Sequence, residues 1–442
     1  MLSPARDIAL DILIRVEQGG FASELLHSER LDKLSTADRG LCTELVMGVL
    51  RWRSRLDEAI ASVSSQKLSK LDDEVLESLR LAAYQIGFLQ RIPAHAAVND
   101  SVELVKRKKK RSAAPFVNAV LRKLLARKEV FEPTLSSGPV TIPDLVLMQS
   151  HPLWLVERWA TRYGLEAAAQ ICTYDQSIPP TTIHVGDEAV WQELESLGIA
   201  LEPGVLVRGA HRVTSGDITK TKPFLESRVW IQDEGSQLVA TLVGRGERLL
   251  DCCAAPGGKT AILAERNPQS SITAAEIHEH RARTMQKRLQ SRTNVKVITA
   301  DATKLNESNF DRVLADVPCS GTGTLARNPE IKWRLQPADL TDLHQRQIGI
   351  LRAAMSKLSP GGRVVYSSCS LEPEENEEVI ADVIQDSRFR VCNMRDELRS
   401  LQHNGELVYH DVNKLTDGNY LRTLPGQVPA DGFFAAIIER VK

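Results

Sequence analysis

The sequence predicts a multidomain protein in which an all-helical N-terminal domain and a small α+β module precede a C-terminal α/β domain. Three observations support this prediction. Residues 1–130 space their apolar side chains as helices do and show no strand pattern. A stretch rich in turn-forming residues follows, with short mixed elements after it. From about residue 228, strand-like and helix-like segments alternate, which is typical of a mostly parallel, doubly wound sheet.

The chain has 442 residues, enough for two to three domains. Its content of 42% hydrophobic and 26% charged residues indicates an ordinary globular protein. We therefore expect a helical domain over 1–130, a linker over 131–144, the α+β module over 145–227 and the α/β domain over 228–442.

The helical domain begins at Ser3-Pro4, where a capping residue precedes a proline at the first helical position. Ile8, Ile12 and Val16 then repeat every four residues. Further helices are predicted after Ser35 and over 71–89, 94–106 and 115–127. We interpret their apolar stripes as core.

Basic residues gather at the end of this domain, although the net charge of the whole chain is only −1. Residues 101–130 contain ten Lys or Arg and two Glu, a net of +8, and 106–111 is an unbroken basic run. Such a run is either a solvated loop or a phosphate contact.

The cysteines and the first residues indicate a reducing compartment. The seven cysteines are odd in number and include no C-x-x-C pair, which argues against disulfides and a zinc site. Arg6, Asp7 and Asp11 interrupt the apolar pattern that a signal peptide needs, and no apolar run reaches the roughly 18 residues of a membrane span. We expect a cytoplasmic protein without a metal or a membrane partner.

The later elements follow in order. In the α+β module we predict a helix over 151–163, a strand over 181–185, a helix over 188–197 and strands over 205–207 and 211–214. In the α/β domain we predict strands over 248–252, 271–276, 295–300, 311–316, 363–367 and 432–439. The helices there are predicted to begin at 259 and to cover 279–290, 337–358 and the acidic segment 373–385.

A glycine-rich turn connects the first of these strands to its helix. Small residues let a ligand approach the backbone closely, and the start of the helix favours an anion. A turn without a ligand remains an alternative, and a P-loop is disfavoured because Cys253 stands where that motif needs glycine. The candidate cofactor residues are Cys253, Ala254, Ala255, Pro256, Gly257, Gly258 and Lys259.

Acidic residues end the next two strands. Glu276 can accept both hydroxyls of a ribose, and Asp301 can hold the exocyclic amine of an adenine. The turn is not G-x-G-x-x-G and no redox motif accompanies it, so S-adenosylmethionine fits this unit better than a dinucleotide.

Two cysteines, Cys319 and Cys369, follow neighbouring strands of the α/β domain, at the edge where open sheets collect their chemistry. Methylation at carbon 5 of a pyrimidine needs a thiolate that adds to carbon 6 and makes carbon 5 nucleophilic. Asp316 is placed to stabilise the ring at nitrogen 3. Lys259 is a candidate for the positive charge that favours a thiolate. Methylation of an amino group needs no thiol, and the Asp-Pro-Pro-aromatic pattern of such enzymes is absent.

The chain resembles the RNA cytosine-5 methyltransferases in several segments. These are 252–260, Asp316-Val317-Pro318-Cys319-Ser320-Gly321-Thr322-Gly323, Ser368-Cys369-Ser370 with Glu375-Asn376-Glu377, 328–333, 431–434 and 232–237. The resemblance implies a Rossmann-like catalytic domain that uses S-adenosylmethionine. Segments 93–99 and 116–122 are similar to the NusB-type RNA-binding domain. Bacterial enzymes that join the two parts act on 16S ribosomal RNA, which implies this RNA as the partner, free or in an early small-subunit intermediate, and cytosine 967 as the target.

In the RNA enzymes of this family the cysteine that matches Cys369 attacks, and the one that matches Cys319 assists release. In DNA cytosine-5 enzymes the Pro-Cys cysteine attacks, and spacing alone does not decide between the two. The family more often has aspartate at the position of Glu276. Lys332, Trp333 and Arg334 are candidates for lining the RNA entrance, with packing as the alternative for Trp333. A non-catalytic ribosome-assembly or antitermination factor and a P-loop NTPase remain as other classes, and we expect a monomer.

Overall fold

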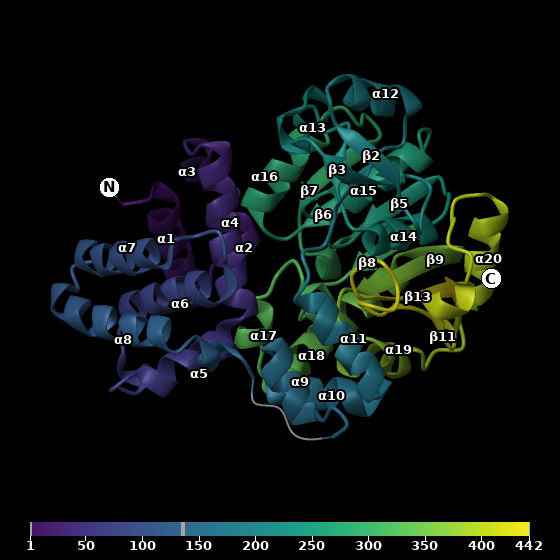
Figure 1. Cartoon of the computed structure of the whole chain (residues 1–442). Coiled ribbons are helices and arrows are strands. Elements are labelled where there is room, and N and C mark those ends of the chain that lie inside the picture. Colours follow the sequence, from purple (N-terminus) through teal and green to yellow (C-terminus); the bar gives the residue numbers. More distant parts are fainter. Residues whose placement is uncertain (1, 134–137, 442) are drawn as a thin grey trace. The chain divides into compact units, whose positions relative to one another are not determined.

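The chain divides into two compact units in the computed structural model, which describes residues 2–133 and 138–441 (Figure 1). The first unit contains Met1–Ile178 and Leu325–Arg334, and the second contains Pro179–Thr324 and Leu335–Lys442. The expected module over 145–227 is therefore shared between the units. Part of the expected linker, 134–137, lies outside the described residues.

The first unit is helical, as predicted. Helix α6 is its centre, because α1, α4, α5, α7 and α8 all pack against it. The short helices α2 and α3 were not predicted, since four residues are too few for a periodic pattern. The helices are α1 (Pro4–Glu17), α2 (Ala22–Leu25), α3 (Glu29–Asp32), α4 (Thr36–Arg51), α5 (Arg53–Val63), α6 (Asp73–Phe88), α7 (Ala94–Arg107), α8 (Ala114–Ala126), α9 (Ile142–Gln149), α10 (Leu153–Tyr163), α11 (Leu165–Asp175) and α17 (Ile331–Arg334).

The segment Leu325–Arg334 joins this unit although it lies between Cys319 and Cys369 in sequence. The Nζ of Lys332 donates a hydrogen bond to the carbonyl of Arg51 at 3.1 Å, and the Nε1 of Trp333 donates to that of Leu50 at 2.6 Å. These carbonyls end α4, where the helix offers them no partner and a positive charge is favourable.

The second unit contains two sheets. The smaller one has the strand order β2-β3-β1-β4 and is antiparallel. The prediction of a strand over 205–207 was wrong, because only Val207 forms an isolated bridge there, and β2 was missed. The elements are β1 (Thr181–His184), α12 (Glu188–Ser196), β2 (Ala200–Pro203), β3 (Ala210–Ser215), α13 (Lys222–Leu225) and β4 (Trp230–Ile231).

The larger sheet has the order β11-β12-β13-β9-β8-β5-β6-β7, with β10 paired to β13. The five strands from β9 to β7 are parallel, as predicted. The other pairings are antiparallel, so the sheet is mixed rather than mostly parallel. The strands are β5 (Arg248–Asp251), β6 (Ser271–Glu276), β7 (Val295–Thr299), β8 (Phe310–Asp316), β9 (Leu358–Ser368), β10 (Phe389–Val391), β11 (Thr416–Asp417), β12 (Tyr420–Thr423) and β13 (Phe433–Arg440).

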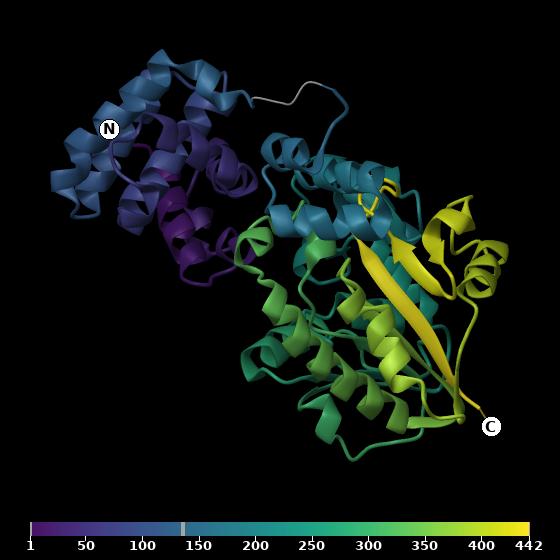
Figure 2. The same cartoon turned by 90° about the horizontal axis from the view of Figure 1, so that it is seen from below.

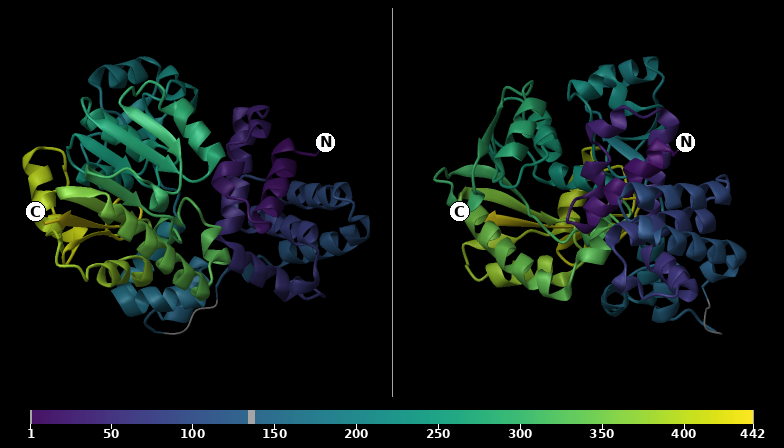
Figure 3. Two further views of the ribbon diagram at one scale, coloured as in Figure 1. Left: turned by 180° about the vertical axis from the view of Figure 1, so that it is seen from behind. Right: turned by 90° about the vertical axis from the view of Figure 1, so that its left-hand side faces the viewer.

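Helices cover both faces of this sheet (Figures 2 and 3). Successive strand residues alternate between the two cores, so Val364 and Tyr366 face one core and Val365 faces the other. The helices are α14 (Glu234–Leu242), α15 (Gly258–Arg266), α16 (Glu279–Arg288), α18 (Pro337–Ser356), α19 (Glu377–Val383) and α20 (Met394–His403). Two predicted elements need correction, because β9 begins at Leu358 and the predicted helix over 373–385 is interrupted at Asn376.

The order of the parallel strands creates a switch point between β5 and β8. The chain proceeds from β5 to β6 and β7 on one side, then crosses to β8 and β9 on the other. Ligands of open α/β sheets bind in the crevice at such a point, beyond the carboxyl ends of the strands. The polar residues at this edge therefore define the candidate site.

Candidate functional site

Two cysteines meet at the carboxyl edge of the large sheet. Cys319 follows β8 and Cys369 follows β9, and their Sγ atoms are 3.1 Å apart. The backbone N–H of Cys369 donates to the Sγ of Cys319 at 3.3 Å. The two residues, 50 positions apart in sequence, thus form one reactive pair.

An ion pair lies at the same edge. The Nζ of Lys259, in the first turn of α15, is 2.8 Å from Oδ2 of Asp316, the last residue of β8. The hydroxyl of Ser367 donates to the other carboxylate oxygen at 2.7 Å. Burial favours a neutral amine at Lys259, but Asp316 and Cys369 outweigh it and raise the pKa of Lys259. The site therefore contains a firmly held positive charge.

The two thiols differ in their surroundings. The pKa of the Cys319 thiol is raised well above its usual value by its hydrogen bond with Cys369 and by burial, and the negative charge of Glu375 contributes further. Cys369 interacts electrostatically with Lys259. A thiolate is stabilised by a nearby cation. The two thiols therefore have different charged neighbours, the cation Lys259 for Cys369 and the anion Glu375 for Cys319.

The glycine-rich turn connects β5 to α15, as predicted. Gly257 has φ +105°, a conformation that only glycine adopts without strain, and it precedes the first residue of α15. A Cβ atom on Gly258 would lie 2.9 Å from Oε1 of Gln232. The turn thus presents bare backbone at the start of a helix, which suits close approach by a ligand.

Asp251, the last residue of β5, was not predicted as a site residue. The hydroxyl of Thr260 donates to its Oδ2 at 2.7 Å, whereas Oδ1 is buried without a hydrogen-bond partner among the described residues. Burial raises the pKa of Asp251 to about 7. An orphaned carboxylate oxygen beside the turn is a ready partner for the amine of a ligand.

The other two predicted acids also lie at this edge. Glu276 ends β6 and accepts the backbone N–H of His278 at 2.9 Å. Asp301, just after β7, accepts the backbone N–H of Thr303 at 2.9 Å and its hydroxyl at 2.7 Å. Ile277 follows Glu276 with 59% of its side chain exposed, an apolar surface that we had not predicted.

Two expectations about nucleic-acid contacts need revision. Lys332 is only 1% exposed, so the prediction that it lines an RNA entrance was wrong, and Trp333 packs in the first unit. Most of the basic run 106–111 is neutralised within its own unit. Its ion pairs are Lys106 with Glu103, Arg107 with Asp7, Lys108 with Asp11, and Lys110 with Asp72.

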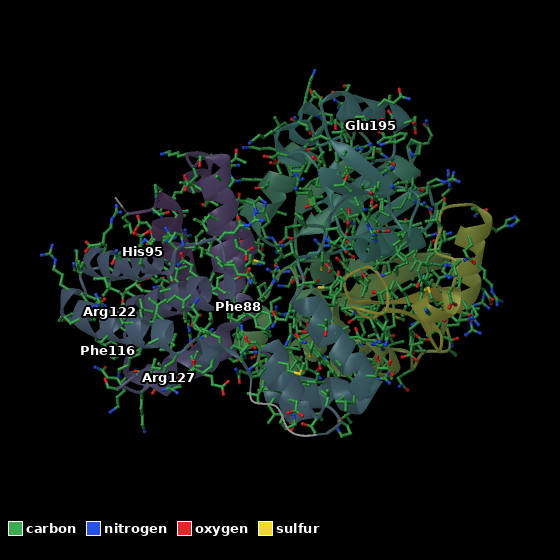
Figure 4. The ribbon with its side chains drawn as sticks, in the orientation of Figure 1. Phe88, His95, Phe116, Arg122, Arg127 and Glu195 are labelled. Atoms are coloured by element: carbon green, nitrogen blue, oxygen red, sulfur yellow. The ribbon has the colours of Figure 1, made fainter. Side chains whose placement is uncertain are left out.

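A few cations of this region have no carboxylate partner among the described residues. Lys109 and Arg111 are exposed and take part in no ion pair. Arg122, labelled in Figure 4, extends from α8 and contacts only the amide oxygen of Asn118, at 3.3 Å. Across residues 2–133 and 138–441, no group of three or more His, Cys, Asp or Glu could hold a metal ion, and no helix is long and apolar enough to cross a membrane.

Comparison with known protein families matches both parts of the chain. Residues 241–439 match the model described as 16S rRNA methyltransferase RsmB/F, and residues 3–126 match the NusB family. The chain is 36% identical to the probable ribosomal RNA small subunit methyltransferase B of Bacillus subtilis (strain 168), over 97% of both chains. It is 33% identical to the ribosomal RNA small subunit methyltransferase B of Vibrio cholerae, over 91% of this chain and 90% of the relative.

Solved structures share the fold. The crystal structure of PH0851 covers 100% of this chain and 99% of its own, with a TM-score of 0.81 at 22% identity. A methyltransferase homologue from Pyrococcus horikoshii covers 69% of this chain and all of its own, with a TM-score of 0.56 at 26% identity.

Proposed function

Because the chain belongs to the RsmB/F family of S-adenosylmethionine-dependent 16S rRNA methyltransferases, we propose that it methylates carbon 5 of a cytosine through a covalent cysteine adduct. The observation that carries this proposal is the 3.1 Å contact between Sγ of Cys319 and Sγ of Cys369 beside the Lys259–Asp316 pair. Transfer to an amino group would need neither thiol.

Cys369 is the nucleophile in this proposal. Its thiolate adds to carbon 6, and the electron pair of the carbon 5–carbon 6 double bond moves toward carbon 5 and the ring. Lys259 provides a cation that interacts with Cys369, and Asp316 stabilises the ring at nitrogen 3. After methylation, Cys319 assists release: the carbon 5 proton leaves to a base, the bond between Sγ of Cys369 and carbon 6 breaks, and the double bond reforms.

The cofactor site consists of the turn Cys253–Lys259 with Glu276 and Asp301. The residues fit S-adenosylmethionine, because the bare turn accepts close approach, the orphaned Asp251 oxygen offers a partner for an ammonium group, and Ile277 offers an apolar surface for a base. When bound, the cofactor supplies the methyl group as an electrophile. Glu276 would hold the ribose hydroxyls, and Asp301 the adenine amine.

The substrate proposed is 16S rRNA, with cytosine 967 as the expected target. The base must leave its stack to reach the pocket, which favours an unpaired nucleotide in free RNA or in an early small-subunit intermediate. Phosphate contacts by Lys109, Arg111 and Arg122 would position the RNA without reading its sequence.

The test is transfer of a labelled methyl group to unmodified 16S rRNA, with the product mapped by bisulfite sequencing. We expect one new 5-methylcytosine, complete loss with Cys369→Ala, and an accumulating covalent RNA adduct with Cys319→Ala. Cys392→Ala, which changes a half-buried cysteine directly after β10, is the matched control. A methylated product from Cys369→Ala, or a methyl group at an amino nitrogen, would overturn the proposal.

A further inference from the structure

One buried carboxylate holds both cysteine loops. Glu375 is fully buried, and its two oxygens accept four hydrogen bonds. Oε1 accepts the backbone N–H of Ser320 at 2.8 Å and Nε2 of Gln347 at 2.9 Å. Oε2 accepts the hydroxyl of Ser370 at 2.5 Å and also that of Ser320.

Ser320 and Ser370 each directly follow a reactive cysteine. Their hydroxyl oxygens are 3.1 Å apart, so Glu375 closes a ring of hydrogen bonds between the loop after β8 and the loop after β9. The backbone of Glu375 is fixed as well, because its carbonyl accepts the hydroxyl of Tyr366 at 2.6 Å. The donors to this carboxylate thus come from the two cysteine loops and from α18.

Burying a charge without a cation is costly unless hydrogen bonds replace its water. Among the described residues, no Lys or Arg forms an ion pair with Glu375, and four charge-assisted bonds take that place. Burial of this carboxylate is energetically unfavourable, yet it contacts Ser320 and Ser370, the residues that follow the two cysteines. This arrangement points to a role in holding the geometry of the cysteine pair.

We propose that Glu375 is a positioning residue that sets the separation of the Cys319 and Cys369 sulfurs and thereby the geometry of addition and release. This inference rests on the proposed function for its catalytic meaning, although the sulfur geometry exists without it. Since the negative charge of Glu375 helps to raise the pKa of Cys319, it also favours the protonated form of that thiol.

The first test measures geometry without RNA. Diamide, a thiol oxidant that accepts two electrons, should convert the Cys319–Cys369 pair into a disulfide, and peptide mass spectrometry gives the rate. We expect this rate to fall at least tenfold with Glu375→Gln, because the side-chain amide nitrogen cannot accept the hydrogen bonds that align the two loops. The lost alignment of the sulfurs should outweigh the easier ionisation of Cys319. Glu378→Gln makes the same charge change on the exposed side of α19 and should react like the wild type.

The second test measures methyl transfer. With Glu375→Gln we expect kcat to fall by about 100-fold with unchanged KM for RNA, because a displacement of about 1 Å has effects of that size. The pH–rate profile should shift, since the Cys319 thiol ionises more easily without the charge. Ser370→Ala, which removes one donor, should lower the disulfide rate and kcat by smaller factors. It replaces Glu375→Gln in both tests if that variant does not fold.

The outcomes separate this inference from the proposed function. Slower disulfide formation in a protein whose wild type methylates no RNA would retain the positioning role and reject the function. Equal disulfide rates for the wild type, Glu375→Gln and Ser370→Ala would overturn the positioning role, as would a loss of activity that appears only in KM.

Discussion

At the scale of single residues, the two thiols have neighbours of opposite charge. Lys259 interacts with Cys369, while Glu375 lies near Cys319 and raises its pKa. A cysteine attacks only as a thiolate, and a nearby cation stabilises that form, so these charges support our proposal that Cys369 attacks and Cys319 assists release. Sequence spacing alone left this choice open.

The buried acid at the end of β5 should make stability depend on pH. The pKa of Asp251 is about 7 in the folded chain because of burial, against 3.8 for an exposed aspartate. Between about pH 4 and pH 7 the unfolded state releases this proton and the folded state retains it, so stability falls as pH rises. Asp251→Asn should remove a loss of about 4 kcal/mol in the free energy of unfolding across this window.

Thermal unfolding of the ligand-free protein at pH 5 and pH 8 checks this prediction. Asp251→Asn should narrow the difference between the two melting temperatures, whereas Asp396→Asn, an exposed acid on α20, should leave the wild-type difference intact. Equal differences for all three proteins would show that Asp251 is ionised in the folded state throughout.

At the scale of elements, the loop after β8 is held by backbone as well as by Glu375. The N–H of Gly432 donates to the carbonyl of Gly323 at 2.7 Å, and the N–H of Gly323 donates to the carbonyl of Cys369 at 2.9 Å. These bonds connect the cysteine loops to the start of β13. Strand β13, whose position but not antiparallel direction was predicted from the sequence, is thus part of the framework of the site.

Gly323→Ala should disturb this framework. A Cβ atom would lie 2.3 Å from the carbonyl oxygen of Gly432, and backbone cannot yield as a flexible side chain does. We expect methyl transfer to fall by roughly 100-fold, because the loop that carries Cys319 must shift. Gly349→Ala on α18, where a Cβ meets nothing within 4 Å, should leave activity unchanged and stabilise its helix by up to about 1 kcal/mol. If Gly323→Ala and the wild type had equal activities in a steady-state methyl-transfer assay, this prediction would be wrong.

The sequence predicted most elements of the catalytic half closely. Strands such as 271–276 are apolar runs that end in an acid, and both ends of such a run can be recognised in the sequence alone. The glycine-rich turn between β5 and α15 was predicted for a similar reason, because its glycines and its flanking strand and helix are contiguous in sequence.

Features made by distant residues escaped prediction. The role of Glu375 depends on Ser320, 55 positions away, and the burial of Lys332 depends on the end of α4, 281 positions away. Strand direction was missed at the antiparallel edge, because an apolar run has the same pattern in either direction. The basic run looked like a free phosphate site, since its acidic partners Asp7, Asp11 and Asp72 are remote in sequence.

At the scale of the whole molecule, RNA binding cannot rely on total charge. The net charge is −1, and four of the six cations in the run 106–111 are already paired. Affinity for phosphates must then come from the few cations without partners. Lys109 and Arg111 are two of them, and both lie in the segment between α7 and α8.

The double variant Lys109→Ala with Arg111→Ala should therefore weaken RNA binding in a salt-dependent manner. Each phosphate contact contributes about 0.7 to 0.9 to the slope of log affinity against log salt, so the slope should fall by roughly 1.5. The double variant Lys67→Ala with Lys70→Ala removes the same charge from another exposed part of the first unit and controls for net charge. Filter binding of a 16S rRNA fragment from 50 to 300 mM salt measures both. Equal slopes for the two double variants would mean that Lys109 and Arg111 contribute only to the net charge of the protein and contact no phosphate.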